Sequence, residues 1–178
     1  RMASTSVCRQ RNNRFKDVLM LNTDSMMSWI KTHFVRKRDI GVARPYTPVI
    51  TCGGTAFTSI AYTEQVGQYA LVGGLVFYAF QIVVNTFTLG AGSGNLYVSL
   101  PFPSANNSEA NRVRAAAVFQ GINISGTPIG VGFTSVKGES YGAFLAIQNN
   151  SAVTTVTINL LGSGDSMMAS GFYFMSEK

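Results

Sequence analysis

The sequence predicts an all-β protein, in which an antiparallel, jelly-roll-like β-sandwich over residues 41–178 follows a basic arm over residues 1–40. Three observations lead to this fold class. From Tyr46 onward, short runs rich in β-branched and aromatic residues recur at close spacing, which is typical of β-sandwiches. Many of the 18 glycines gather between these runs, where tight turns need them. No run with helical spacing separates the strands.

The stretch Val66–Pro101 organises the predicted sandwich, because it contains the longest expected strand, Leu75–Leu89. Side chains alternate between the two faces of a strand. The odd-numbered residues from Phe77 therefore share one face and the even-numbered residues from Tyr78 share the other, and both faces are largely apolar. We expect a second sheet to cover one face and another subunit the other. Three sandwiches around an axis would do so, whereas in the alternative a loop of the same sandwich covers that face.

Residues 1–40 carry the net charge of the chain. They hold nine basic and three acidic side chains, whereas residues 41–178 hold five of each. We expect an extended or disordered arm over residues 1–14, a short helix over residues 15–21 and a second, amphipathic helix over residues 25–35. The apolar stripe of the second helix would rest either on the protein's own sheet or on a neighbouring subunit or viral shell. We expect the arm to dock on a partner through Arg9, Arg11, Arg14, Trp29, Phe34, Arg36, Lys37 and Arg38.

A linker over Asp39–Pro48 connects arm and sandwich, and its two prolines favour extended backbone. We place the domain boundary near Ile40. The turns between the following strands are rich in glycine, asparagine and proline. The expected strands cover Pro48–Cys52, Ser59–Val66, Tyr69–Val72, Leu75–Leu89, Asn95–Leu100, Arg114–Ile122, Ile129–Ser135, Ala143–Gln148, Thr154–Leu160 and Met168–Met175.

Three pieces of the sandwich occur in an order known from one class of viral proteins. Tyr46-Thr47-Pro48 opens the domain, Gly67-Gln68-Tyr69 precedes Val72–Val76, and Gly92–Leu96 leads to Ser99–Phe102. Over residues 45–178 the chain resembles the β-sandwich domain of tail-fibre and other surface proteins of tailed bacteriophages. The resemblance implies a virion-surface domain, usually a homotrimer without enzymatic activity, that decorates the particle or binds a host glycan or protein receptor.

The sequence offers no recognisable catalytic, cofactor or metal site. His33 is the only histidine and lies in the arm, and Cys8 and Cys52 are the only cysteines, so neither a histidine-activated nucleophile in the sandwich nor a usual zinc site is expected. A glycosidase needs two facing carboxylates, but the acidic residues of the sandwich are scattered in sequence: Glu64, Glu109, Glu139, Asp165 and Glu177. Tyr141, in a predicted loop, is the candidate for ligand contact.

These observations predict a non-enzymatic structural protein on the surface of a virus particle that assembles in the host cytoplasm. The main hypothesis is a phage capsid decoration protein or a short tail or head fibre. Its expected partners are two further copies in a homotrimer and the capsid or tail proteins that hold the arm, with no membrane, nucleic-acid or cofactor contact. In one alternative, a receptor-binding fibre tip contacts a host glycan through Tyr141. In the other, a small icosahedral capsid protein binds nucleic acid through its arm.

Overall fold

The computed structural model describes residues 41–178 with the exception of residues 107–113, 123, 125–127, 149–152 and 177–178. The predicted arm, its two helices and all the docking residues proposed for it therefore lie outside the described residues, as do Glu109 and Glu177.

The described chain is almost entirely β-structure, and its strands pair antiparallel throughout. This confirms the predicted fold class, an all-β antiparallel sandwich. Neighbouring strands follow the order β1-β3-β4-β10-β6-β7-β8-β5-β2, and β9 pairs with β8. The strands are β1 (Arg44–Tyr46), β2 (Ile50–Cys52), β3 (Ser59–Val72), β4 (Leu75–Thr88), β5 (Leu96–Ser99), β6 (Arg114–Gln120), β7 (Pro128–Ser135), β8 (Tyr141–Gln148), β9 (Thr154–Thr155) and β10 (Ser166–Phe174).

The sheet bends back on itself and closes around one core. Phe80 of β4 and Phe133 of β7 are separated by two strands along the sheet, which in a flat sheet would place them about 14 Å apart. Their ring centroids nevertheless lie 5.3 Å apart, and Phe144 of β8 lies 4.9 Å from Phe133. The two halves of the sheet therefore face each other across these aromatic rings.

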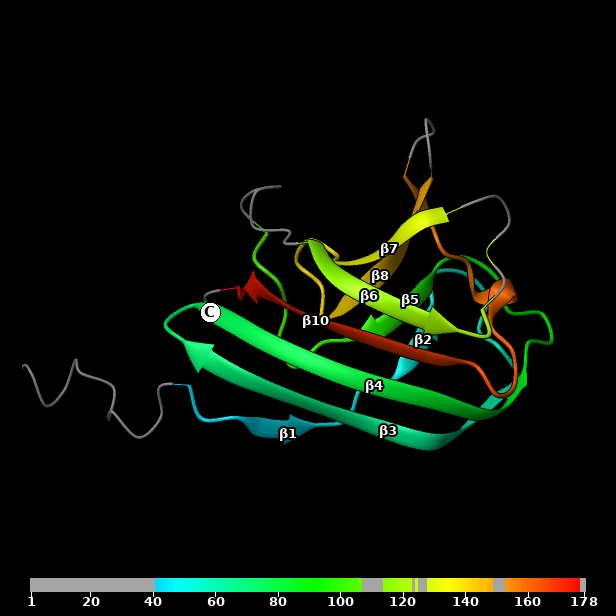
Figure 1. Ribbon diagram of the computed structural model, residues 1–178, viewed down its shortest axis with the longest axis horizontal. Coiled ribbons are helices and arrows are strands. Elements are labelled where there is room, and N and C mark those ends of the chain that lie inside the picture. Colours follow the sequence, from blue (N-terminus) through cyan, green and yellow to red (C-terminus); the bar gives the residue numbers. More distant parts are fainter. Residues whose placement is uncertain (1–40, 107–113, 123, 125–127, 149–152, 177–178) are drawn as a thin grey trace, which may run out of the picture. The chain divides into compact units, whose positions relative to one another are not determined.

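The hairpin of β3 and β4 is the longest element and forms the lower edge of the fold in Figure 1. Along β4, Val76, Tyr78, Phe80, Ile82 and Val84 are all buried in the core. The even-numbered face of this strand is thus covered by the second half of the sheet, as the alternation of the sequence predicts. The odd-numbered side chains of β4 point away from the core.

Four local predictions are wrong. Ser59–Val66 and Tyr69–Val72 form one continuous strand, because the Tyr46 ring of β1 packs over Gly67 and fills the place of its missing side chain. The linker contains the edge strand β1, where Pro45 lies at a sheet edge that tolerates proline. Thr154–Leu160 is a two-residue strand followed by a 3-10 turn. Tyr141 begins β8 and does not lie in a loop.

Candidate interaction surfaces

The sheet presents one broad face to solvent, which we call the outer face. It consists of the side chains of β3, β4, β10 and β6 that point away from the core, because the register of these strands aligns them in rows. Its members are Glu64, Val66, Gln68, Ala70 and Val72 of β3; Leu75, Phe77, Ala79, Gln81 and Val83 of β4; Ala116, Val118 and Gln120 of β6; and Ser166, Met168, Ser170, Phe172 and Phe174 of β10.

The outer face is apolar and nearly without charge. Phe77 is 42% exposed, Phe172 41% and Val118 57%, and such large apolar side chains are usually buried in a soluble domain. Glu64, near one end of the face, is the one charged residue among the members named above, and its Oε2 accepts a hydrogen bond from the Gln81 side-chain amide at 2.9 Å. A continuous apolar patch of this kind marks an interaction site.

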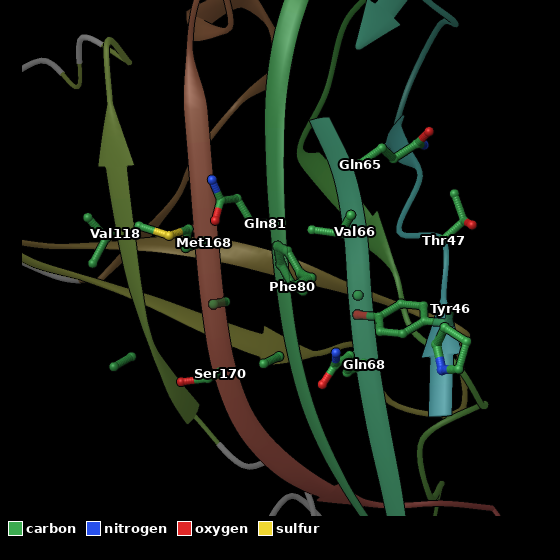
Figure 2. A pocket seen from close by; sticks show the side chains of 15 residues that line it. Tyr46, Thr47, Gln65, Val66, Gln68, Phe80, Gln81, Val118, Met168 and Ser170 are labelled. Atoms are coloured by element: carbon green, nitrogen blue, oxygen red, sulfur yellow. The ribbon is translucent and has the colours of Figure 1, made fainter. Parts of the chain in front are cut away.

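The side chains of successive rows differ in size, so a row of small side chains between rows of larger ones forms a groove. Ala79, Ser170 and Ala116 are register partners on three adjacent strands, and their small side chains form its floor. Figure 2 shows Gln81, Met168 and Val118 at one level across the strands and Ser170 and Gln68 at the next. The groove has a volume of about 880 Å³ and extends across β3, β4, β10 and β6 to Pro45 and Thr47 beside β3.

A second candidate surface lies on the opposite half of the sheet. The rings of Tyr97 in β5 and Tyr141 in β8 stack with centroids 4.6 Å apart and planes 28° apart. Both rings are half-buried. The Asn95 side-chain amide donates to the Tyr97 hydroxyl at 3.4 Å, and Ser99 is the register partner of Tyr141. The pair combines an aromatic surface with hydroxyl and amide groups, the combination that can hold a sugar ring.

Burial raises the pKa of the Tyr141 hydroxyl, and the nearby Glu139 carboxylate and Tyr97 raise it further. The hydroxyl is therefore neutral at physiological pH and can donate a hydrogen bond. Sequence reasoning singled out Tyr141 but did not pair it with Tyr97, because neither strand carries a signal that the two rings meet. It also missed Phe172 and Val118, because alternation places each side chain on one face of its own strand, and only the pairing of β4 with β10 and of β10 with β6 shows that this face is shared with Phe77.

Two further residues considered in the sequence, Asp165 and Cys52, have partners within the fold. Asp165 is buried in a turn, where its Oδ2 accepts the Gly162 backbone N–H at 2.6 Å, so its role there is structural. Cys52 is a free thiol whose Sγ donates to the Thr55 carbonyl. In the part of the chain that the structure describes, no three histidine, cysteine or acidic residues gather as a metal site would require. None of the helical structure described there could cross a bilayer.

Comparisons of the chain with protein-family models, with curated proteins and with solved structures found no match.

Proposed function

We propose that this chain is a non-enzymatic structural protein of a virus particle, a phage surface protein that decorates the capsid or forms a short tail or head fibre. In this proposal three β-sandwiches associate, and residues 1–40 anchor the trimer to other virion proteins. The single observation that carries the proposal is the outer face, a second apolar surface on a sandwich that already has a closed core. Such a face is costly in water and suits a protein that works inside an assembly.

The distribution of charge supports the same function. Residues 41–178 have equal numbers of basic and acidic side chains, so the full net charge of +6 belongs to residues 1–40. A neutral sandwich can pack beside identical copies without electrostatic repulsion. A basic arm is suited to an acidic surface on a different protein. We infer that residues 41–178 bind further copies of this chain and that residues 1–40 bind other proteins of the virus particle.

Immunogold electron microscopy with an antibody raised against the purified chain tests this function. Gold on the surface of intact virus particles from the source culture is the expected result. A variant without residues 1–40 should keep the β-sheet circular dichroism spectrum of the full chain and fail to bind particles that lack the protein. Unlabelled particles, or binding of the variant as strong as that of the full chain, would overturn the proposal.

The stacked Tyr97–Tyr141 pair supports a second candidate function, the binding of a host glycan. Aromatic rings beside hydroxyl and amide groups suit a neutral sugar, because the ring faces contact C–H groups while the polar groups contact hydroxyls. Saturation-transfer NMR with neutral gluco-, galacto- and manno-oligosaccharides should detect binding that Tyr141→Ala abolishes. Phe172→Ala on the outer face is the matched control and should retain it. The absence of a signal from every sugar would remove this candidate.

A further inference from the structure

We propose that copies of this chain contact each other through their outer faces, with an aromatic ridge on one copy seated in the groove of the next. The inference rests on the proposed function only in that the protein is taken to be a homo-oligomer. It adds that the outer face makes the contact between copies and that the ridge of one copy packs into the groove of another.

The aromatic ridge consists of Phe77 of β4 and Phe172 of β10, which are register partners with ring centroids 5.9 Å apart. Leu75 and Phe174 form the next row and extend the ridge toward the end of the hairpin. On the other side of Phe77 and Phe172 lies the groove, whose floor begins at Ala79. Ridge and groove are therefore adjacent, run in the same direction across the strands and have complementary shapes.

The chemistry of the outer face selects a second copy over other occupants. A nucleic acid or an acidic protein would require basic side chains, and the described members of this face include none. Gln68, Gln81 and Ser170 beside the groove could hydrogen-bond an extended sugar chain, but Gln81 already donates to Glu64. The large exposed members of the face, Phe77, Val118, Met168 and Phe172, offer no hydrogen-bonding groups. A neutral, apolar surface matches another neutral, apolar surface, and every further copy of this chain supplies one.

The size of the face is sufficient for such a contact. Five rows of residues about 7 Å apart on four strands about 4.8 Å apart cover on the order of 500 Å² of flat area. In a ring, each copy offers its ridge to one neighbour and its groove to the other, so one contact buries about 500 Å² in total, and the two contacts that hold each copy bury about 1,000 Å² together. Such a contact joins different patches on the two copies, so it is heterologous, and a heterologous contact forms closed rings when its rotation permits. A ring of three agrees with the proposed trimer.

Sedimentation velocity of the full chain at micromolar concentration tests the contact. Phe77→Glu on the ridge and Val118→Glu beside the groove each place a charge in the proposed interface, and we expect at least a tenfold weaker association for either variant. Ile129→Glu is the matched control, because Ile129 is 68% exposed on β7, outside the outer face. Circular dichroism establishes that all three variants remain folded. A monomeric wild-type chain, or variants that associate like the control, would overturn the inference.

A charge exchange tests how the faces fit. Phe77→Glu and Ala116→Lys should each dissociate the oligomer, and the double variant should reassociate in dilute buffer and separate again in high salt. Within one chain these positions lie on β4 and β6, two strands and one row apart, or roughly 12 Å, a distance that the two side chains bridge only when both are fully extended toward each other. A double variant that stays monomeric would rule out the packing of ridge into groove. Particle labelling in the preceding section is independent of either result, so the two proposals can fail separately.

Discussion

At the scale of single residues, the core contains tyrosine hydroxyls in two different situations. The Tyr173 hydroxyl donates to the Phe102 carbonyl at 3.0 Å and accepts the Phe102 N–H at 3.1 Å. The Tyr46 hydroxyl is also buried, but it has no hydrogen-bond partner among the described residues. The same chemical group therefore stabilises the fold at one position and opposes it at the other.

This contrast predicts opposite effects of the same substitution. Tyr173→Phe should lower the free energy of unfolding by about 1–3 kcal/mol, because it leaves two backbone groups of Phe102 without their partner. Tyr46→Phe should leave the free energy of unfolding unchanged or raise it by about 1 kcal/mol, because it removes a buried hydroxyl that makes no hydrogen bond. Urea denaturation of both variants beside the wild type measures the difference. A loss in Tyr46→Phe equal to that in Tyr173→Phe would show that the Tyr46 hydroxyl has a partner.

Buried tyrosines also predict how stability depends on pH. Burial raises the pKa of Tyr46, Tyr78 and Tyr173, and the proximity of other tyrosines raises the pKa of Tyr46 and Tyr78 further. The unfolded chain loses these protons near pH 10, while the folded chain still holds them, so the contribution of these tyrosines to stability is constant below that pH and is lost above it. Each tyrosine contributes a slope of up to about 1.4 kcal/mol per pH unit.

Urea midpoints measured from about pH 8 to about pH 11 test this slope. Tyr173→Phe removes one of the titrating groups, so its stability should fall less steeply above pH 10 than that of the wild type. Equal slopes for the two proteins would contradict the assignment of the effect to buried tyrosines.

At the scale of strands, two glycines allow neighbouring aromatic rings to lie against the backbone. A Cβ atom at Gly67 of β3 would lie 2.5 Å from Cε1 of Tyr46, and one at Gly142 of β8 would overlap the Phe133 ring. Aromatic rings that cover glycines in this way are a known means of fixing strand register. The short edge strand β1 is therefore held at its place by a ring over Gly67.

Alanine at either glycine should destabilise the protein. We expect Gly142→Ala to cost about 1–3 kcal/mol or more, because the fully buried Phe133 has no room to move. Gly67→Ala should cost less, since Tyr46 lies at an edge strand and is only partly buried. Gly132→Ala is the control, because the nearest atom to its added Cβ would be the Ala115 carbonyl oxygen at an ordinary 3.5 Å. Thermal denaturation ranks the three variants, and equal melting temperatures would contradict the role of the rings.

The strands that the sequence predicts well are those whose local signals agree with their surroundings. The alternation in β4 predicts both its buried face and its exposed apolar face, because burial follows the period of two. The error at Gly67 has a tertiary cause, since glycine ordinarily weakens a strand and the ring that compensates for it comes from β1. The Tyr97–Tyr141 pair likewise depends on the pairing of β5 with β8, which no local pattern encodes.

For the molecule as a whole, the sandwich and residues 1–40 have separate electrostatic characters. The sandwich is neutral, and its outer face is apolar, so its association with further copies should depend little on salt. Binding by the charged arm should weaken as salt increases, because exposed charges are screened over about 10 Å at 0.1 M ionic strength. A rise in salt concentration should therefore weaken the contact made by the arm and leave the contact between copies almost unchanged.

The corresponding variant neutralises the arm without changing the sandwich. Substitution of Arg9, Arg11, Arg14, Arg36, Lys37 and Arg38 by glutamine removes a net charge of +6 from the full chain. We expect this variant to sediment as the same oligomer as the wild type but to lose association with virus particles, whereas Lys137→Gln on an exposed turn should bind particles normally. Particle binding that persists after neutralisation would contradict an anchor based on the charge of the arm.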